Sequence, residues 1–182
     1  MIDFVLCILV ADFLVGFVHW AEDTYGTPNW IRPLDTQIVL PNIDHHRKPS
    51  AIGSASNWFT RNYVPVIAFL LLFVAITILF GFSLRLFWVG LFASLGNEVH
   101  TWNHRKAKDN PGWVRFLQDT GLVQTRQQHN RHHVPPYDCY YCTLTNVVNA
   151  FLEPLRFWRG LEWCLSCLGI SVKRGSTERG GF

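Results

Sequence analysis

The residues best suited to chemistry in this sequence are its eight histidines, which fall into four short groups. His100 and His104 are one helical turn apart, as are His129 and His133, so each pair predicts two imidazoles on one helix face. Neutral imidazole is a ligand for iron, zinc, copper and nickel. A tetrahedral site uses four ligands, so eight imidazoles predict a centre with two metals. The predicted ligands are His19, His45, His46, His100, His104, His129, His132 and His133.

Carboxylates and amides near the histidines are further candidates. Asp23 follows His19 at the same one-turn spacing, and Asn97 and Glu98 immediately precede the third group. The chain lacks the paired Glu-x-x-His motifs of carboxylate-rich bundles, which favours iron that acts on O2 and a lipid chain. The alternative is that histidines at a membrane surface contact lipid headgroups, and that a single pair arises by chance. The grouping of all eight favours the metal.

The elements that carry these histidines are expected to lie in a membrane. Charged residues make up 16% of the 182-residue chain, against about 25% in an ordinary soluble domain. Arg61 and Arg85 bracket 23 uncharged residues, and the run 63–84 is long enough to cross a bilayer core as a helix. Apolar runs at 2–18 and at 86–95, the latter extending to about His100, predict two more helices, and the runs 63–84 and 86–95 are expected to form a tight helical hairpin. The predicted fold class is an all-α membrane protein with three to four membrane-embedded helices.

The basic residues predict how these helices are oriented. If three helices cross, fifteen of the sixteen Lys and Arg residues lie on one side and only Arg85 lies on the other. The positive-inside rule makes the first side cytoplasmic, and all four histidine groups fall there, in a helical cap. Two amphipathic stretches, 146–158 and 161–170, are expected to lie against the membrane face. We therefore expect a multi-pass protein of a bacterial inner membrane or the endoplasmic reticulum.

Several function classes are excluded by what the sequence lacks. The net charge is +3 and no run of Lys and Arg exceeds two residues, so the chain does not resemble a nucleic-acid binder. It contains no GxGxxG, GxxxxGK[ST] or GxSxG motif, and therefore no recognisable dinucleotide, nucleoside triphosphate or serine-hydrolase site. Electrons for any redox reaction must then come from a partner.

The cysteines offer a competing metal site. Cys139 and Cys142 form one CxxC pair, and Cys164 and Cys167 form another, as in a four-cysteine zinc ribbon. Here 21 residues separate the pairs, more than is usual, and the second pair lies in the apolar stretch LEWCLSCLG. Buried free cysteine is common in helices, so we expect these residues to serve helix packing.

Several longer motifs resemble the Kua-type lipid desaturases. They are DFLVGFVHWAEDTYG (12–26), the 45–46 histidine pair with Pro49 following, NEVHTWNH (97–104), LQDTGL (117–122), QQHNRHHVPP (127–136) and YYCTLTNVVN (140–149). That family includes plasmanylethanolamine desaturases, which form the vinyl ether of plasmalogens, their bacterial CarF-type relatives, and a plant plastid branch that inserts a trans double bond into phosphatidylglycerol. The resemblance covers about residues 10–160. Tyr137 stands where plasmalogen-forming members tend to carry a further histidine.

The resemblance implies one lipid desaturase domain over residues 1–172, followed by a polar tail at 173–182. It implies two iron ions held by the eight histidines, with Asp23 as a ninth ligand or as a residue that orients one, and no catalytic side chain beyond these. O2 is the implied co-substrate, and a cytochrome b5-type or ferredoxin-type protein is the implied electron donor. The implied reaction is desaturation of a phospholipid chain, most specifically at the vinyl-ether bond of plasmalogens.

Two alternatives stay open at this point. The first is an acyl-chain desaturase or hydroxylase that acts on another phospholipid, because both reactions begin with the same activation of O2. The second belongs to another class: a metal-binding membrane regulator without enzymatic activity.

Overall fold

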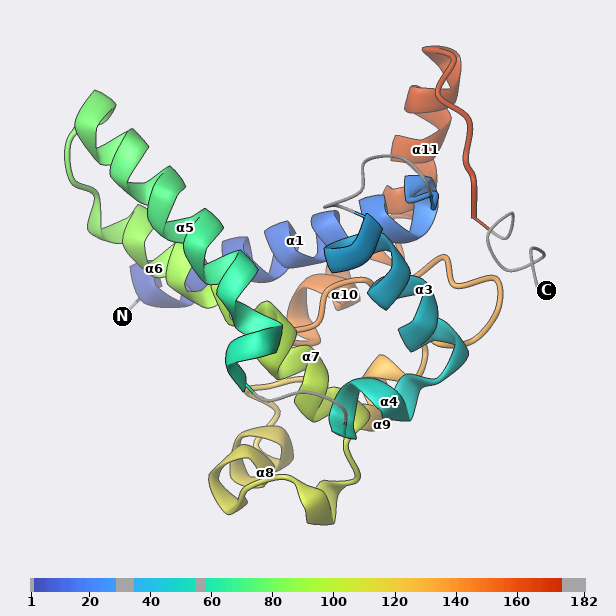
Figure 1. Cartoon of the computed structure of the whole chain (residues 1–182), viewed down its shortest axis with the longest axis horizontal. Coiled ribbons are helices and arrows are strands. Elements are labelled where there is room, and N and C mark those ends of the chain that lie inside the picture. The colour runs from blue at the N-terminus through green and yellow to red at the C-terminus, as the bar shows by residue number, and fades with distance from the viewer. Residues whose placement is uncertain (1, 29–34, 55–57, 175–182) are drawn as a thin grey trace.

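The structure, a computed structural model, describes residues 2–28, 35–54 and 58–174, and every regular element within these ranges is a helix (Figure 1). The α-helices are α1 (Ile2–Tyr25), α3 (Leu40–Arg47), α4 (Pro49–Ser54), α5 (Trp58–Phe80), α6 (Leu84–Ser94), α7 (Gly96–His104), α8 (Gly112–Asp119), α9 (Arg126–His129), α10 (Val147–Leu152) and α11 (Phe157–Cys167). A π-helical turn, η1 (Asp35–Val39), leads into α3, and a 3₁₀ turn, η2 (Ala107–Asp109), follows α7. The all-helical prediction is confirmed. Arg32 and most of the predicted tail, residues 175–182, lie outside the described residues.

Among the described residues, two helices are long and apolar enough to cross a membrane: α1, and residues Asn62–Phe80 of α5. No residue in the apolar window of α5 is buried by the rest of the protein, and Leu71 and Ile78 are 68% and 78% exposed. A continuous apolar surface of this kind marks contact with a membrane or a partner. α1 continues past the end predicted at residue 18, so that His19 and Asp23 lie within its last two turns.

α5 and α6 form the predicted tight hairpin. Its turn begins at Gly81, whose φ of +87° is a left-handed conformation that glycine adopts at little cost. Ser83 then caps α6 by accepting a hydrogen bond from the Leu86 amide. The two helices approach closely at Gly90, where a Cβ atom would lie only 2.2 Å from the ring of Phe69.

The third predicted membrane helix is divided into two elements. α6 has 11 residues, and at about 1.5 Å per residue it is roughly 16 Å long, about half of a 30 Å bilayer core. The helix is interrupted at Leu95, and α7 then begins with the polar sequence that carries His100 and His104. The apolar part of the predicted helix and its histidine-bearing part are therefore separate elements.

α1 packs against α6 on one side and against the segment 140–145 on another. At Gly16 a Cβ atom would lie 2.5 Å from the Cys142 sulfur, so the two backbones meet closely. Two buried clusters fill this region. One consists of Trp20, Tyr141, Cys142 and Trp158, and the other of Ala11, Val99 and Leu144.

The two amphipathic stretches form α10 and α11, with bounds that differ from the prediction. They are separated at residues 153–156, where Arg156 takes a left-handed φ of +49°. The large apolar side chains of Phe151 in α10, Leu155 between the two helices and Trp163 in α11 are exposed. Exposed apolar side chains are expected of helices that lie against a membrane. α11 instead turns Trp158 and Glu162 toward the body of the protein.

The prediction that the second CxxC pair serves helix packing is wrong. Cys164 and Cys167 are both exposed on α11, because the buried face of that helix carries other residues. Cys139 is half-buried and Cys142 is fully buried. Within the described residues, no cysteine belongs to a cluster that could hold a metal.

Candidate metal centre

All eight histidines and Asp23 converge into two groups. The first, the five-histidine group, consists of His45, His100, His104, His129 and His133. The second, the mixed group, consists of His19, Asp23, His46 and His132. In each group the possible ligand atoms lie within 4.8 Å of one another. Every residue predicted as a metal ligand is therefore brought into one of two compact clusters.

Short helices present these side chains from several directions. α7 places His100 and His104 on one face, as the one-turn spacing requires. α9 begins with a capping box, in which Thr125 and Gln128 exchange hydrogen bonds with each other's backbone amides, and it ends at His129. The turn that follows carries His132 and His133 into different groups.

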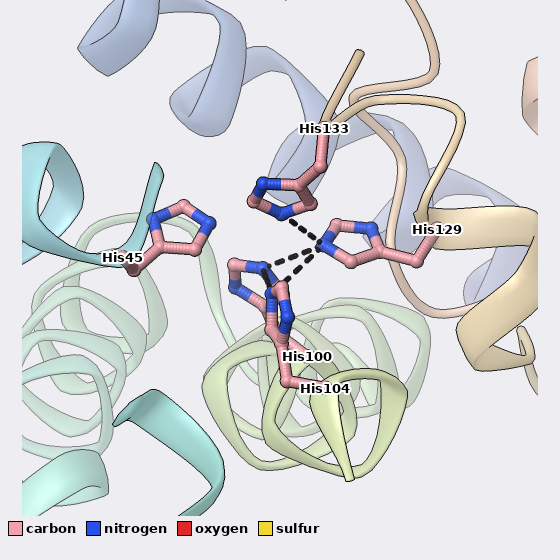
Figure 2. Close-up of side chains that lie close together, drawn as sticks. All are labelled: His45, His100, His104, His129 and His133. Atoms are coloured by element: carbon pink, nitrogen blue, oxygen red, sulfur yellow. Dashed lines mark hydrogen bonds between the residues drawn. The ribbon is translucent and has the colours of Figure 1, made fainter. Parts of the chain in front are cut away.

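The imidazoles of the five-histidine group face one another (Figure 2). The Nε2 atoms of His100, His104 and His129 lie 2.9, 2.9 and 3.1 Å apart, and Nε2 of His133 lies 3.1 Å from that of His129. A neutral imidazole carries a single N–H. Three nitrogens in mutual contact cannot all be satisfied by such donors, whereas one cation between them satisfies every lone pair.

Burial keeps these rings neutral. Removal from water, reinforced by repulsion from neighbouring histidines, lowers the pKa of His104 from 6.5 to about 3. The same causes hold the pKa of His45 and of His129 well below 6.5. Neutral imidazole is the form that binds a metal, so the cluster needs no deprotonation at physiological pH.

The mixed group is built around the Asp23 carboxylate. Its Oδ1 lies 2.9 Å from Nε2 of His46, and its Oδ2 lies 3.1 Å from Nε2 of His132 and 3.5 Å from Nε2 of His19. The side-chain amide of Asn42 donates a 2.6 Å hydrogen bond to Oδ1, which fixes the carboxylate. This group therefore differs from its neighbour by one negative charge.

Backbone carbonyls orient three of the rings. Nδ1 of His19 donates to the carbonyl of Tyr141 at 3.0 Å, Nδ1 of His132 to that of Cys139 at 2.8 Å, and Nδ1 of His45 to that of Asn42 at 2.9 Å. A carbonyl only accepts, so the proton sits on Nδ1 and Nε2 keeps its lone pair. Metal-binding histidines are commonly fixed in this way by their second nitrogen.

The donor sets fit two metal ions. Imidazole nitrogen binds metals such as zinc at about 2.0–2.1 Å, so opposite ligand atoms lie at most about 4.2 Å apart. The observed limit of 4.8 Å requires only a small contraction around an ion. Nine ligand atoms, eight from imidazoles and one from a carboxylate, suit divalent metals that accept imidazole.

Sequence analysis missed the residues that support this centre. Asp12 lies within the apolar run 2–18, and it accepts hydrogen bonds from the amides of Leu144 and Thr145 and from the Thr145 hydroxyl, at 2.9, 3.1 and 2.6 Å. A buried carboxylate in a lipid-facing helix was the available signal. Glu98, a predicted candidate, accepts hydrogen bonds from Trp102 and Asn62.

Comparison with known proteins places this site in a family context. The model of the lipid desaturase domain family matches residues 8–174. The chain is 33% identical to plasmanylethanolamine desaturase 1 of Mus musculus over 85% of its own length, and 30% identical to a probable fatty acid desaturase of Acanthamoeba polyphaga mimivirus over 88%. It is also 30% identical to plasmanylethanolamine desaturase of Myxococcus xanthus over 85%. It spans 60%, 80% and 56% of these three proteins, and no solved structure matches it.

Proposed function

Because this chain belongs to the lipid desaturase family, we propose that it is a membrane di-iron enzyme that uses O2 to introduce a double bond into a phospholipid chain. The observation that carries the proposal is the convergence of eight imidazoles and one carboxylate in two clusters. The reaction removes two hydrogens from adjacent carbons. Its balance is CH₂–CH₂ + O2 + 2 electrons + 2 H⁺ giving CH=CH + 2 H₂O.

The choice of iron rests on the reaction. Imidazole and carboxylate ligands accept zinc as readily as ferrous iron. Breaking an unactivated C–H bond requires a metal with accessible oxidation states, and zinc has none. Bound iron would supply the activation of O2 and the oxidising power for both hydrogen abstractions.

The chain's own residues hold, orient and shield the centre. The five-histidine group and the mixed group supply the ligands, and the carbonyls of Tyr141 and Cys139 fix the rings of His19 and His132. His129 and His132 are completely buried, so bulk water is kept from this part of the centre. Exclusion of water prevents competing reactions of a strong oxidant.

A membrane lipid is the substrate that fits the location. His19 and Asp23 stand near the end of α1, the same helix that leaves Leu6, Val10 and Leu14 exposed farther along its apolar length. The mixed group thus shares α1 with a surface suited to hydrocarbon. We propose that the site lies on the cytoplasmic face and that a cytochrome b5-type or ferredoxin-type protein supplies the electrons.

Within phospholipids, we propose the alkyl chain of a plasmanyl lipid, so that the product is the vinyl ether of a plasmalogen. Support comes from the two relatives named plasmanylethanolamine desaturase, one from mouse and one from a bacterium. The second candidate is an acyl-chain desaturase, favoured by relatives named fatty acid desaturase, including fatty acid desaturase 4-like 1 of Arabidopsis thaliana.

The test is expression in a host that contains plasmanyl ethanolamine lipids but no plasmalogens, followed by mass spectrometry. Acid-labile vinyl ethers should form with the wild-type chain and not with His104→Ala. A new acyl double bond without vinyl ethers would support the second candidate. Unchanged lipids with a metal-loaded protein and a competent electron donor would contradict the enzymatic function and favour a regulator.

A further inference from the structure

The carbonyls that orient His19 and His132 belong to one segment without regular secondary structure, residues 139–145, here called the carbonyl loop. The two acceptors, Cys139 and Tyr141, flank Tyr140. Tyr140 has a φ of +59°, a left-handed conformation that costs a non-glycine residue about 1 kcal/mol. Something must hold the backbone in this conformation, because an alternative φ at Tyr140 would turn the neighbouring carbonyls away from the imidazoles.

α10 and the residue that caps it hold the loop. The Tyr140 amide donates a 2.6 Å hydrogen bond to Oε1 of Glu153, the residue that caps the C-terminal end of α10. One turn earlier, Asn149 forms two bonds with Cys142: its Oδ1 accepts from the amide at 3.1 Å, and its Nδ2 donates to the carbonyl at 2.8 Å. Asn149 is fully buried.

The far end of the loop is held by other helices. Asp12 of α1 binds the amides of Leu144 and Thr145, and Asn103 of α7 donates to the Thr143 carbonyl at 2.9 Å. Those contacts secure the loop's end. Arg131 donates a 3.4 Å hydrogen bond to the hydroxyl of Tyr140, but among the described residues only Glu153 bonds to its backbone amide, between the two acceptor carbonyls.

We propose that Glu153 is a positioning residue for one metal of the pair. By holding Tyr140 in its left-handed conformation, Glu153 aims the carbonyls of Cys139 and Tyr141 at His132 and His19. Both of these histidines belong to the mixed group, and neither belongs to the five-histidine group. Loss of the Glu153 contact should therefore weaken one metal site and spare the other. This inference rests on the proposed two-metal function.

The test compares three substitutions at Glu153 in the full-length protein in detergent. Glu153→Gln keeps an oxygen at the same reach for the Tyr140 amide, Glu153→Asp keeps the charge but withdraws the oxygen by one methylene, and Glu153→Ala removes the acceptor. Asp119→Ala, a change at an exposed acidic residue of α8, serves as the control. Metal-free proteins are titrated with Co(II), and the visible spectrum and the bound metal per chain are recorded.

We expect two bound metals in the wild type, in Asp119→Ala and in Glu153→Gln. In Glu153→Asp and Glu153→Ala, one of the two should bind about 10–100-fold more weakly, the range measured when groups that orient ligands are removed. The other should bind as before. If Glu153→Ala fails to fold, the comparison of Glu153→Gln with Glu153→Asp still tests the proposal. The proposal requires an oxygen that reaches the Tyr140 amide and does not require a charge on residue 153.

Three results would overturn the inference. Equal weakening of both metals would show a general structural role for Glu153. Unchanged binding in Glu153→Asp and Glu153→Ala would show that the loop needs no such support. A wild-type chain that binds a single metal would contradict the proposed two-metal function itself. The wild-type measurement therefore distinguishes failure of that function from failure of the role proposed for Glu153.

Discussion

His45 and His46 are neighbours in sequence, yet their imidazoles belong to different metal groups. Successive side chains on an α-helix point about 100° apart, so one short helix can serve two ions at once. The Asn42 residue one turn earlier supports both, with its carbonyl accepting from His45 and its amide binding Asp23. At the residue scale, the centre therefore divides into two sites with separate ligands and a shared scaffold.

Single histidine substitutions should each empty one site. His104→Ala removes a ligand of the five-histidine group, and His132→Ala removes one of the mixed group. Each variant should hold about one iron per chain instead of two and should lose lipid desaturation, because the chemistry needs both ions. Elemental analysis and lipid mass spectrometry provide the measurements. Full activity in either variant would contradict the ligand assignment.

The convergence of the eight histidines and Asp23 could be predicted from sequence because imidazole is a specific metal ligand and the one-turn spacings place these side chains on one helix face. The support around it could not. Asp12 contacts Leu144 and Thr145, which lie more than 130 positions later in the chain. Nothing in the local sequence of either segment specifies that contact. The partners of Asp12 are backbone amides, which every residue carries, so residue types alone give no indication of them.

At the element scale, close helix packing in the hairpin depends on one glycine. At Gly90, a side chain would overlap the ring of Phe69, whereas the helical Gly160 of α11 has open space around its Cβ position. Gly90→Val should thus destabilise the protein by about 1–3 kcal/mol, the usual cost of overpacking. Gly160→Ala is the matched control and should be neutral or stabilising by about 0.5–1 kcal/mol.

Thermal unfolding of both glycine variants in the same detergent provides the measurement. The expected order of unfolding midpoints is Gly90→Val lowest, then wild type, then Gly160→Ala at or above it. A Gly90→Val protein as stable as wild type would show that α5 and α6 separate in the detergent-solubilised protein.

The second CxxC pair provides a test of α11. Cys164 and Cys167 are exposed, and neither contributes to a metal cluster among the described residues. Replacement of both by Ser should leave bound iron at about two per chain and desaturation within a few-fold of wild type. Elemental analysis of the double variant decides, since loss of a metal ion would favour the zinc-ribbon interpretation.

Element types were easier to predict than element ends. Long apolar runs predicted α1 and the α5–α6 hairpin, because lipid-facing helices need a continuous apolar sequence. The break at Leu95 and the extension of α1 to Tyr25 were not predicted. Both places contact distant segments of the chain: Gly96 meets Val15 of α1, and the backbone carbonyl of Thr24, in the last turn of α1, accepts a hydrogen bond from the backbone amide of Lys173.

At the scale of the whole molecule, the longest exposed apolar surfaces among the described residues belong to α1 and α5. In Figure 1 the α5–α6 hairpin and α11 extend to the same side, and α8 and α9 lie on the opposite side. The residues proposed as metal ligands come from α1, α3, α7, α9 and the turn after α9, so the proposed centre joins the long apolar helix α1 to the short helices.

The proposed topology predicts where a reporter fused after Phe182 will be found. Fifteen of sixteen basic residues group on one side of the predicted spans, and the positive-inside rule makes that side cytoplasmic. The reporter should be active in the cytoplasm, as measured with paired alkaline phosphatase and fluorescent-protein fusions. A periplasmic or lumenal reporter would contradict the cytoplasmic location of the cap.

Removal and replacement of the metals separate their structural role from their chemical role. Without ions, the nitrogen lone pairs of the five-histidine group face one another and the Asp23 charge is buried without a cation. Any ion that binds only the folded protein raises its stability by mass action. Chelation should therefore lower the unfolding midpoint, and either Zn(II) or Fe(II) should restore it. Only Fe(II), with O2 and an electron donor, should restore desaturation, because zinc has no redox chemistry. Lipid desaturation by the zinc-loaded protein would refute the assignment of iron.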